Sequence, residues 1–162
     1  MLILLDLSKA FDSVNHNILL SKLIRYNIDT FWFKNYLENR AQSVKAGSHI
    51  SNPLPITYGV PQGSILGPIL FNIFTNDLFD TDENIDGVCY ADDLQITLSD
   101  TINNIPDIKN KAEYLLNKLK KWYDTNGLLL NIEKTQAIFL RTSAMTKKIP
   151  KDFSLNFIAF KG

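Results

Sequence analysis

A pair of adjacent aspartates between two strand-like runs constrains the fold of this chain more than any other feature. Asp92 and Asp93 lie within Val88–Leu98, where apolar residues flank them on both sides, and this pattern predicts a β-hairpin with both carboxylates at its tip. Aspartate is common in tight turns because its side chain accepts local backbone hydrogen bonds. Two carboxylates also offer the oxygen ligands that Mg²⁺ prefers. These residues alone favour the turn, and the rest of the chain must decide.

Size and composition indicate a folded protein without a strong charge signature. The chain has 162 residues, of which 45% are hydrophobic, so we expect one domain with a substantial core. It carries 17 Lys or Arg and 17 Asp or Glu residues, and this balance gives no support for general nucleic-acid binding. Such binding is not excluded, because bound metal ions supply local positive charge.

The sequence contains no signal for secretion or for crossing a membrane. Its single cysteine, Cys89, rules out an internal disulfide and fits a reducing compartment. No signal peptide is visible, and the most apolar stretch, residues 65–74, contains Gly and Pro and is too short to span a bilayer. We therefore expect an intracellular protein, in the nucleus or cytoplasm, without membrane contact.

The first 60 residues predict one buried strand, two helices and a hairpin. Residues 1–7 are apolar except for Asp6, as in a central strand that is covered on both faces. Helical spacing predicts helices over 14–24 and 30–40, and Gly47 marks the turn of a small hairpin. Asp12 or Ser13 is expected to cap the first helix, and the expected buried side of the second consists of Phe31, Phe33, Tyr36 and Leu37.

The remainder predicts further alternation of helices and strands. A glycine-proline loop at 59–64 precedes a helix over 65–79, which is apolar on most faces and therefore expected to be buried. Residues 80–86 are expected to form a solvated acidic turn. A long amphipathic helix over 107–126 ends at Gly127, and short strands are expected at 128–132, 136–141 and 153–157. Strands alternating with helices indicate a sheet with helices packed on it.

Four segments of this sequence, in this order, resemble the motifs of a known family. They are Leu-Asp-Leu-Ser-Lys-Ala-Phe-Asp at 5–12, Gly-Val-Pro-Gln-Gly-Ser-Ile-Leu-Gly-Pro at 59–68, Tyr-Ala-Asp-Asp at 90–93 and Asn-Gly-Leu-Leu-Leu-Asn-Ile-Glu-Lys-Thr at 126–135. Together they resemble the palm domain of reverse transcriptases of non-LTR (LINE-type, Jockey-like) retrotransposons. Tyr-Ala-Asp-Asp alone would be weak evidence, but four motifs in the family's order decide the opening question in favour of a metal site.

The resemblance implies an α+β fold, a polymerase palm in which an antiparallel β-sheet packs against α-helices. The sheet would be built around residues 1–7 and the Asp92–Asp93 hairpin, with the helices at 65–79 and 107–126 behind it. Residues 1–141 would form the palm, as a partial reverse transcriptase domain, and 142–162 a tail or the start of the following region. The fingers and thumb that flank the palm in this family have no counterpart, so we expect a fragment.

The resemblance also implies a metal site. Asp6, Asp92 and Asp93 would bind two Mg²⁺ ions, or Mn²⁺ in their place, and the carbonyl of Leu7 would add a backbone ligand. Three carboxylates held close together would otherwise repel each other and raise one another's pKa. Two ions about 3.5–4 Å apart stabilise the attacking and leaving oxygens of an in-line phosphoryl displacement.

Five other residues receive roles from the resemblance. Phe11 matches the aromatic residue that lies under the sugar and rejects a 2′-OH, although it is alternatively an ordinary core residue. Gln62 and Gly63 match the loop that touches the nucleotide and template, or else form a simple turn. Tyr90 is expected to pack beneath the hairpin near the primer end. Lys134 matches the proposed general acid towards pyrophosphate, or is an ordinary surface lysine.

The implied function is RNA-directed DNA polymerisation. A DNA primer 3′-OH would attack the α-phosphate of a dNTP on an RNA template, and the sequence leaves the oligomeric state open. Two alternatives remain at this point. One is a catalytically inactive remnant that serves at most as a folded binding module. The other is a reverse transcriptase of the group II intron or retron type.

Overall fold

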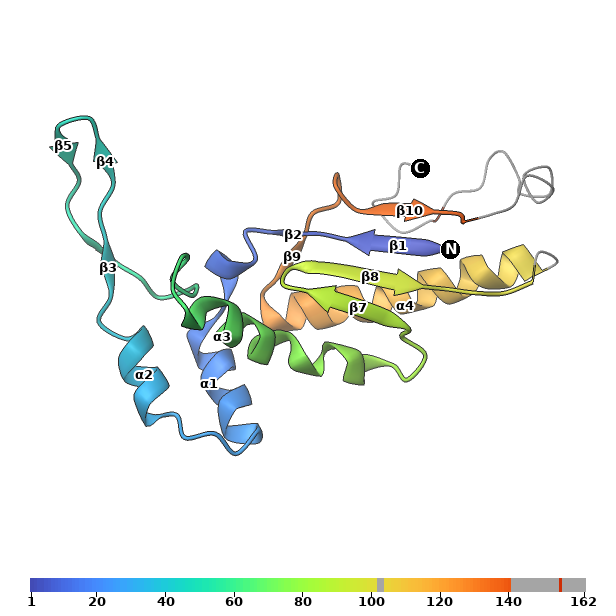
Figure 1. Cartoon of the computed structure of the whole chain (residues 1–162), viewed down its shortest axis with the longest axis horizontal. Coiled ribbons are helices and arrows are strands. Elements are labelled where there is room, and N and C mark those ends of the chain that lie inside the picture. Colours follow the sequence, from blue (N-terminus) through green and yellow to red (C-terminus); the bar gives the residue numbers. More distant parts are fainter. Residues whose placement is uncertain (102–103, 141–154, 156–162) are drawn as a thin grey trace. The chain divides into compact units, whose positions relative to one another are not determined.

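The apolar run at the start of the chain forms the central strand of a four-stranded sheet. We describe residues 1–101, 104–140 and 155 in a computed structural model of the chain. Strand β1 (Leu2–Leu5) has β8 (Asp93–Thr97) on one side and β10 (Gln136–Ile138) on the other, and β7 (Gly87–Tyr90) pairs with β8. All three pairings are antiparallel, as Figure 1 shows.

The register of β1 on β8 places the apolar side chains on one face. Ile3 is opposite Ile96, and Leu5 is opposite Leu94. All four side chains are buried, because alternate residues of a strand point to the same side of the sheet. The expected strand over 1–7 is interrupted at Asp6, and the short strand β2 (Leu7–Ser8) pairs separately with β9 (Leu129–Leu130).

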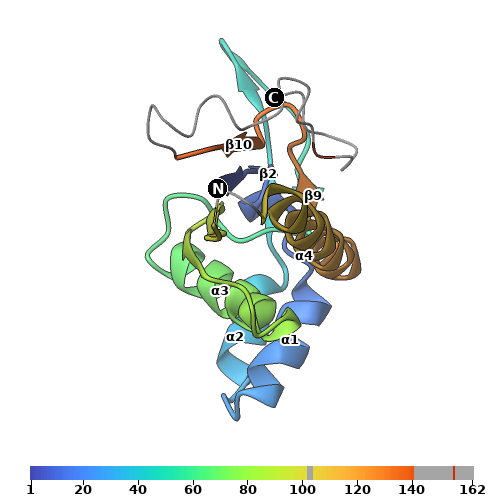
Figure 2. The same cartoon turned by 90° about the vertical axis from the view of Figure 1, so that its right-hand side faces the viewer.

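The long helix α4 (Ile105–Asn126) packs against this sheet, and Figures 1 and 2 show it running alongside the strands. Its stripe at helical spacing is buried as the sequence predicts, at Ile108, Ala112, Leu115, Leu116, Leu119 and Tyr123. Burial and, secondarily, the charge of the Cys89 side chain of β7 raise the pKa of the Tyr123 phenol. Gly127, at φ 72°, ends the helix in the left-handed conformation that favours glycine.

Contacts divide the chain into two compact units, although its length predicts one domain. The sheet and α4 belong to the unit formed by Met1–Ser8 and the residues from Asp77 onwards, and Lys9–Asn76 forms the other. The second unit contains the 3₁₀ turn η1 (Phe11–Ser13) and the helices α1 (His16–Arg25), α2 (Phe31–Leu37) and α3 (Leu66–Thr75). A 3₁₀ segment, η2 (Asn76–Thr81), follows α3.

The second unit also contains the predicted hairpin, which is confirmed. Strands β4 (Lys45–Ala46) and β5 (His49–Ile50) pair around Gly47, and β3 (Ala41–Gln42) pairs with β6 (Leu54–Pro55) at its base. The apolar core of this unit lies between α1 and α3 and includes Leu19, Leu23, Leu70, Phe71 and Phe74.

The helices and the antiparallel four-stranded sheet together confirm the predicted α+β class with an antiparallel sheet.

Three expectations about helices are wrong in detail. Asn15, and neither Asp12 nor Ser13, caps α1, because its side chain accepts hydrogen bonds from the backbone of residues 17 and 18. In α2, Phe31 is 75% exposed and only Leu37 is buried. The helix expected over 65–79 is shorter, because α3 ends at Thr75, and it is not buried all round, since Ile69 is 49% exposed and Ile65 before it is 88% exposed.

The acidic segment after α3 is also different from the expected solvated turn. Asp82 is buried, and its Oδ2 accepts a hydrogen bond of 2.7 Å from Lys118 of α4. The expected strand over 153–157 and the tail from 142 lie outside the described residues, apart from Leu155, which is buried. In the part of the chain that the structure describes, no helix combines the length and apolarity that a membrane crossing requires.

Candidate active site

Asp92 and Asp93 occupy different positions at the tip of the hairpin. Tyr90 and Asp93 are paired across β7 and β8, so Ala91 and Asp92 form a two-residue turn and Asp93 begins β8. Ala91 has a φ of 53°, a left-handed conformation that costs about 1 kcal/mol for a residue other than glycine. The sequence-based hairpin is thus confirmed, with one carboxylate in the turn and the next on the strand.

Asp6 lies at the same end of the sheet as this tip. The pairing of β1 with β8 ends at Leu5 opposite Leu94; Asp6 is the next residue on one strand and Asp93 the next on the other. Neighbouring strands are about 5 Å apart, so the register brings the backbones of these two aspartates close together. The carbonyl of Asp6 accepts a hydrogen bond of 2.8 Å from the backbone N–H of Asn131, which fixes the chain where β1 gives way to β2.

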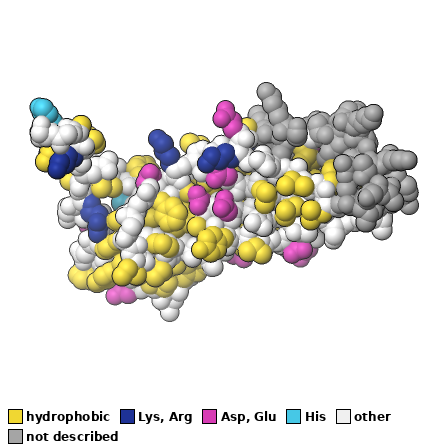
Figure 3. Space-filling model, turned by 45° about the horizontal axis from the view of Figure 1, so that its top comes forward, with side chains coloured by type: hydrophobic (Ala, Val, Ile, Leu, Met, Phe, Trp, Pro, Cys, Tyr) yellow, Lys and Arg dark blue, Asp and Glu magenta, His cyan; other side chains and the backbone are white. Residues whose placement is uncertain are grey.

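The carboxylate of Asp6 is incompletely satisfied. Its Oδ2 atom is buried, and no hydrogen-bond donor among the described residues reaches it. The Nζ of Lys134 lies 3.3 Å from this oxygen and forms an ion pair with it, without the geometry of a hydrogen bond. A buried carboxylate oxygen without a donor is costly, and a cation would relieve that cost. On the face shown in Figure 3, acidic side chains gather close together with Lys or Arg side chains beside them.

The electrostatic effect of the aspartates extends to Cys89 on β7. Burial raises the pKa of the Cys89 thiol, and the negative charges of Asp92 and Asp93 raise it further. The thiol therefore keeps its proton and donates a hydrogen bond of 3.3 Å to the carbonyl of Ala91.

These residues fit a divalent cation by their chemistry, although they do not form a closed set of ligands. Carboxylate and carbonyl oxygens suit a hard cation, and the orphaned oxygen of Asp6 is a suitable ligand atom. Within residues 1–101, 104–140 and 155, however, no group of three or more His, Cys, Asp or Glu side chains is arranged to hold a metal ion. The assignment of Asp6, Asp92 and Asp93 as metal ligands remains a prediction.

Two further residues assigned to this region differ in their surroundings. Leu7 lies in β2, opposite Leu130, and is buried; its role as a carbonyl ligand remains a prediction. The Tyr90 ring is 83% exposed, so the expectation that it packs beneath the hairpin is wrong. Tyr90 ends an edge strand in which residues alternate between faces, and it shares its exposed side with Val88. Its contact with nucleic acid stays a prediction.

The loop at 59–64 belongs to the second unit and is fixed to the segment before α1. The backbone N–H of Gly59 donates to the carbonyl of Val14 at 2.8 Å, and that of Val60 donates to Phe11 at 2.9 Å. The Nε2 of His16, the first residue of α1, donates to the carbonyl of Gly59 at 2.7 Å. Sequence analysis assigns no site role to His16, and its position in the chain gives no sign of this contact.

The three glycines of the 59–68 motif are needed for different structural reasons. A Cβ at Gly59 would lie 3.0 Å from the backbone of Asp12, and one at Gly67 would lie 2.8 Å from the carbonyl of Pro61. Gly63 has a φ of 77°, and nothing lies within 4 Å of the position its Cβ would take. Packing therefore explains Gly59 and Gly67, whereas Gly63 leaves an open approach to the backbone.

The other predicted nucleotide-binding residues lie in the same unit. The Phe11 ring is half-buried and stacks on Phe71, with centroids 4.7 Å apart, so it contacts the core and still has exposed surface. Gln62 is exposed, and its Nε2 donates to Asp12 Oδ1 at 2.9 Å. The roles of Phe11, Gln62 and Gly63 remain predictions.

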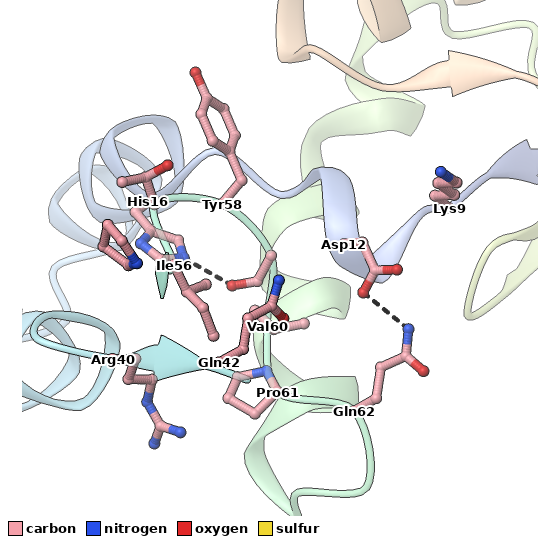
Figure 4. A pocket seen from close by; sticks show the side chains of 13 residues that line it. Lys9, Asp12, His16, Arg40, Gln42, Ile56, Tyr58, Val60, Pro61 and Gln62 are labelled. Carbon is pink, nitrogen blue, oxygen red and sulfur yellow. Dashed lines mark hydrogen bonds between the residues drawn. The ribbon is translucent and has the colours of Figure 1, made fainter. Parts of the chain in front are cut away.

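A pocket of about 610 Å³ opens beside this loop. Figure 4 shows Gln62 and Asp12 at one side of it and His16, Tyr58 and Arg40 at the other. The pocket is lined mainly by polar and basic side chains together with the backbone of the loop. Sequence analysis missed Arg40 and Tyr58, because the hairpin that brings them together contains no recognisable binding motif.

Comparison with known families now adds to this geometry. Residues 1–158 match the family described as reverse transcriptase (RNA-dependent DNA polymerase). The chain belongs to this family. The predicted resemblance to non-LTR retrotransposon reverse transcriptases is confirmed, and so is the palm as the fold of this reverse transcriptase chain.

Individual relatives agree with the family. The chain is 32% identical over 139 residues to the RNA-directed DNA polymerase from mobile element jockey of Drosophila melanogaster, a match that covers 80% of this chain and 15% of the relative. It is 40% identical over 78 residues to the probable RNA-directed DNA polymerase from transposon BS of the same species, covering 47% of this chain and 9% of the relative. The chain thus spans only a small part of the curated relatives it matches.

A solved structure of telomerase from Candida albicans, in complex with a fragment of telomeric RNA, is also similar. The match covers 88% of this reverse transcriptase chain and 28% of the telomerase chain, at 14% identity and a TM-score of 0.49.

Proposed function

We propose that this chain is the catalytic palm of an RNA-directed DNA polymerase of a non-LTR retrotransposon. In the proposed reaction, a DNA primer 3′-OH attacks the α-phosphate of a dNTP that is paired with an RNA template. The observation that carries the proposal is the buried, undonated Oδ2 of Asp6 at the sheet end where the Asp92–Asp93 turn lies. Family membership supports the same reaction.

The proposed metal ligands are the carboxylates of Asp6, Asp92 and Asp93 and the carbonyl of Leu7. When bound there, two Mg²⁺ ions would stabilise the charge that develops on the attacking and leaving oxygens. Asp92 stands in the two-residue turn and Asp93 begins β8, so a change in the turn would move the Asp92 carboxylate relative to Asp6.

We assign Lys134 two successive tasks. Before a cation binds, its ammonium neutralises Asp6 from a distance of 3.3 Å. If Asp6 held a metal ion, the ammonium would be available to donate a proton to the pyrophosphate leaving group, the general-acid role implied by the motif. Lys134 is well exposed and sits on a long flexible stem, which suits a group that changes partners.

Nucleotide selection is assigned to Phe11, Gln62 and Gly63. The half-buried Phe11 ring stacks on Phe71, and in the proposed role this ring would exclude a ribose 2′-OH by steric contact. The open approach at Gly63 admits a nucleotide close to the backbone. Gln62 offers a side-chain amide, with both donor and acceptor atoms, next to it. Tyr90, with its exposed ring, is assigned to the primer end.

The test compares the natural chain with Asp6→Asn, and uses Asp86→Asn as a matched control in an exposed position. Primer extension on an RNA template with Mg²⁺ should be lost by at least about 100-fold in Asp6→Asn and kept in the control. A second readout is thermal unfolding, in which Mg²⁺ should raise the Tm of the natural chain because it binds the folded state. That rise should disappear in Asp6→Asn.

Each outcome has a defined meaning. Equal extension by Asp6→Asn, or an equal Mg²⁺-dependent rise in Tm, would overturn the metal site. A natural chain that shows the Asp6-dependent rise in Tm but no extension would overturn polymerase activity for this chain and favour a binding module.

A further inference from the structure

A stack of three planar side chains runs along the surface of α2 and ends at the pocket. Trp32 and Tyr36 are four residues apart in α2, a spacing that places them on one side of the helix, and Arg40 lies beyond the helix end. The rings of Trp32 and Tyr36 are 5.6 Å apart at their centroids and nearly parallel, with an angle of 7°. The Arg40 guanidinium lies over the Tyr36 ring at 4.4 Å, and its Nε donates to the Tyr36 carbonyl at 2.6 Å.

The Trp32 end of this stack is turned towards solvent, whereas Tyr36 and Arg40 are half-buried. Trp32 is 56% exposed and the neighbouring Phe31 is more exposed still, whereas Leu37 supplies the buried contact of α2. Large aromatic rings held in the open by stacking offer flat surfaces that a further planar group can cover. The guanidinium at the end of the stack is fixed by its two contacts with Tyr36, and therefore presents its charge in a defined direction.

The unit that carries the stack is basic, although the whole chain is neutral. Residues 9–76 contain six Lys or Arg and three Asp or Glu residues, which leaves a net charge of +3 (6 − 3). Arg40 and Lys9 both line the pocket, and Asp12, the acidic residue of its lining, accepts a hydrogen bond from Gln62. The pocket volume of about 610 Å³ lies within the usual range for small-ligand sites, roughly 300–1,000 Å³.

We propose that the Trp32–Tyr36–Arg40 stack and the adjoining pocket bind single-stranded nucleic acid. A base stacks on the exposed Trp32 ring, and backbone phosphates contact Arg40 and Lys9, so that the strand passes from α2 into the pocket. The inference rests on the proposed function only for the identity of that strand as the RNA template. The binding itself requires neither a metal ion nor the aspartates.

The chemistry favours a nucleic acid over a protein partner. Unpaired bases stack on aromatic rings and on arginine planes, while basic side chains follow the phosphates. A protein partner would be expected to cover a continuous apolar patch, whereas this stack leads into a pocket in which Arg, Lys, His and Gln side chains stand beside apolar ones. Duplex nucleic acid fits less well, because its bases are stacked on each other.

The test uses Trp32 as its own reporter. The chain contains two tryptophans, so Trp122→Phe leaves Trp32 as the single one. Addition of a 12-nucleotide single-stranded RNA, with EDTA present, should quench its fluorescence, and an RNA duplex of the same length should have much less effect. Single-stranded DNA of the same sequence tests whether the 2′-OH contributes.

Variants then test the stack by fluorescence anisotropy of labelled RNA. Trp32→Ala and Arg40→Ala should each weaken binding about tenfold, and Trp32→Tyr should restore most of it. Arg25→Ala removes the same charge from α1 and should change affinity less than twofold. Circular dichroism confirms that each variant is folded.

Failure of this proposal is distinguishable from failure of the polymerase proposal, because no extension is measured. Unquenched Trp32 fluorescence, or equal affinity of Trp32→Ala and the natural chain, would overturn it. Loss of self-association in Trp32→Ala without any effect on RNA binding would instead identify the stack as a contact between two copies of the chain.

Discussion

Asp82 lies in a segment whose sequence predicts a solvated turn, but its side chain is only 5% exposed. Its Oδ2 accepts from Lys118 Nζ at 2.7 Å, and its Oδ1 accepts from the backbone and side-chain amides of Asn84. The hydrogen bond from Lys118, followed by those from Asn84, holds the pKa of Asp82 well below its ordinary value. The same pair raises the pKa of Lys118.

This pair predicts a specific dependence of stability on pH. Because the pKa of Asp82 is lower in the folded state than in the unfolded chain, its contribution is fully present above the unfolded value, about 4. The contribution is lost as pH falls from there towards the folded-state pKa. Asp82→Asn should therefore lower the free energy of unfolding at pH 7 and flatten its decline between about pH 4 and 2. Urea unfolding at several pH values measures this.

Asp86→Asn is the matched control, since Asp86 belongs to the same acidic segment and is exposed. This variant should leave nearly unchanged both the free energy of unfolding at pH 7 and its decline at acid pH. If the free energy of unfolding of Asp82→Asn declined with falling pH as steeply as that of the natural chain, other groups would be its cause.

Individual site residues differ in how far sequence reveals them. Asp92 and Asp93 are predictable because the alternation on both sides fixes where the turn must fall. Asp82 is not, because its partner is 36 residues away and nothing in the local pattern marks the pairing. The ion pair of Asp6 with Lys134 likewise depends on the distant pairings of β1 with β10 and of β2 with β9.

At the scale of elements, the loop and helix start at 59–68 owe their shape to three glycines with different requirements. Gly59 combines a φ of 85° with backbone neighbours at 3.0 Å from a hypothetical Cβ. Gly67 has the tighter neighbour, the carbonyl of Pro61, while Gly63 needs only its left-handed conformation. Two glycines of the motif are thus required by close packing, and the third leaves the backbone accessible.

Alanine substitutions should separate these requirements. Gly59→Ala and Gly67→Ala should each lower the free energy of unfolding by about 1–3 kcal/mol, because backbone atoms must move to admit the methyl group. Gly63→Ala should cost about 1 kcal/mol, from conformation alone. Urea unfolding gives these values, and primer extension should show that Gly63→Ala loses more activity than its small loss of stability explains.

A loss of stability in Gly63→Ala equal to that in Gly67→Ala would contradict this separation. Gly47, a positive-φ glycine in the hairpin turn with nothing within 4 Å of its Cβ position, supplies the control. Gly47→Ala should resemble Gly63→Ala in stability and leave extension unchanged.

Elements were predictable where a strong local pattern agrees with the tertiary environment. Helix α4 has a continuous apolar stripe and a glycine stop, so its extent and buried face follow from spacing. Helix α2 has aromatic residues all round, so its sequence does not reveal which ones face solvent. Its exposed stack depends on Arg40, which lies beyond the helix end.

At the scale of the whole molecule, the neutral total charge conceals two opposite contributions. Residues 9–76 carry +3, and the remaining residues carry 11 Lys or Arg against 14 Asp or Glu, a net charge of −3 (11 − 14). The acidic unit holds the proposed metal ligands, and the basic unit the proposed nucleic-acid surface. Composition alone gives no sign of this division, because the acidic unit is assembled from separate parts of the sequence.

Strand β1 lies in the middle of the sheet of the acidic unit, between β10 and β8. A cavity next to β1 should therefore affect the entire sheet. Ile3 is fully buried and has strands on both sides. Ile3→Ala should lower the free energy of unfolding by about 2–5 kcal/mol. Val88→Ala, in the exposed part of the edge strand β7, should change it by less than about 0.5 kcal/mol. Similar losses in both variants, measured by urea unfolding, would rule out β1 as the centre of this core.

The central position of β1 also determines when the sheet is able to form during translation. Leu5 pairs with Leu94, and Leu2 pairs with Ile138, so both neighbours of β1 are made long after it. At about 5–20 residues per second, β1 waits on the order of 5–20 s for β8 and longer for β10. During this interval an apolar strand with two unpaired edges is accessible to other nascent chains. Holding it apart until β10 emerges is a task suited to a ribosome-associated chaperone.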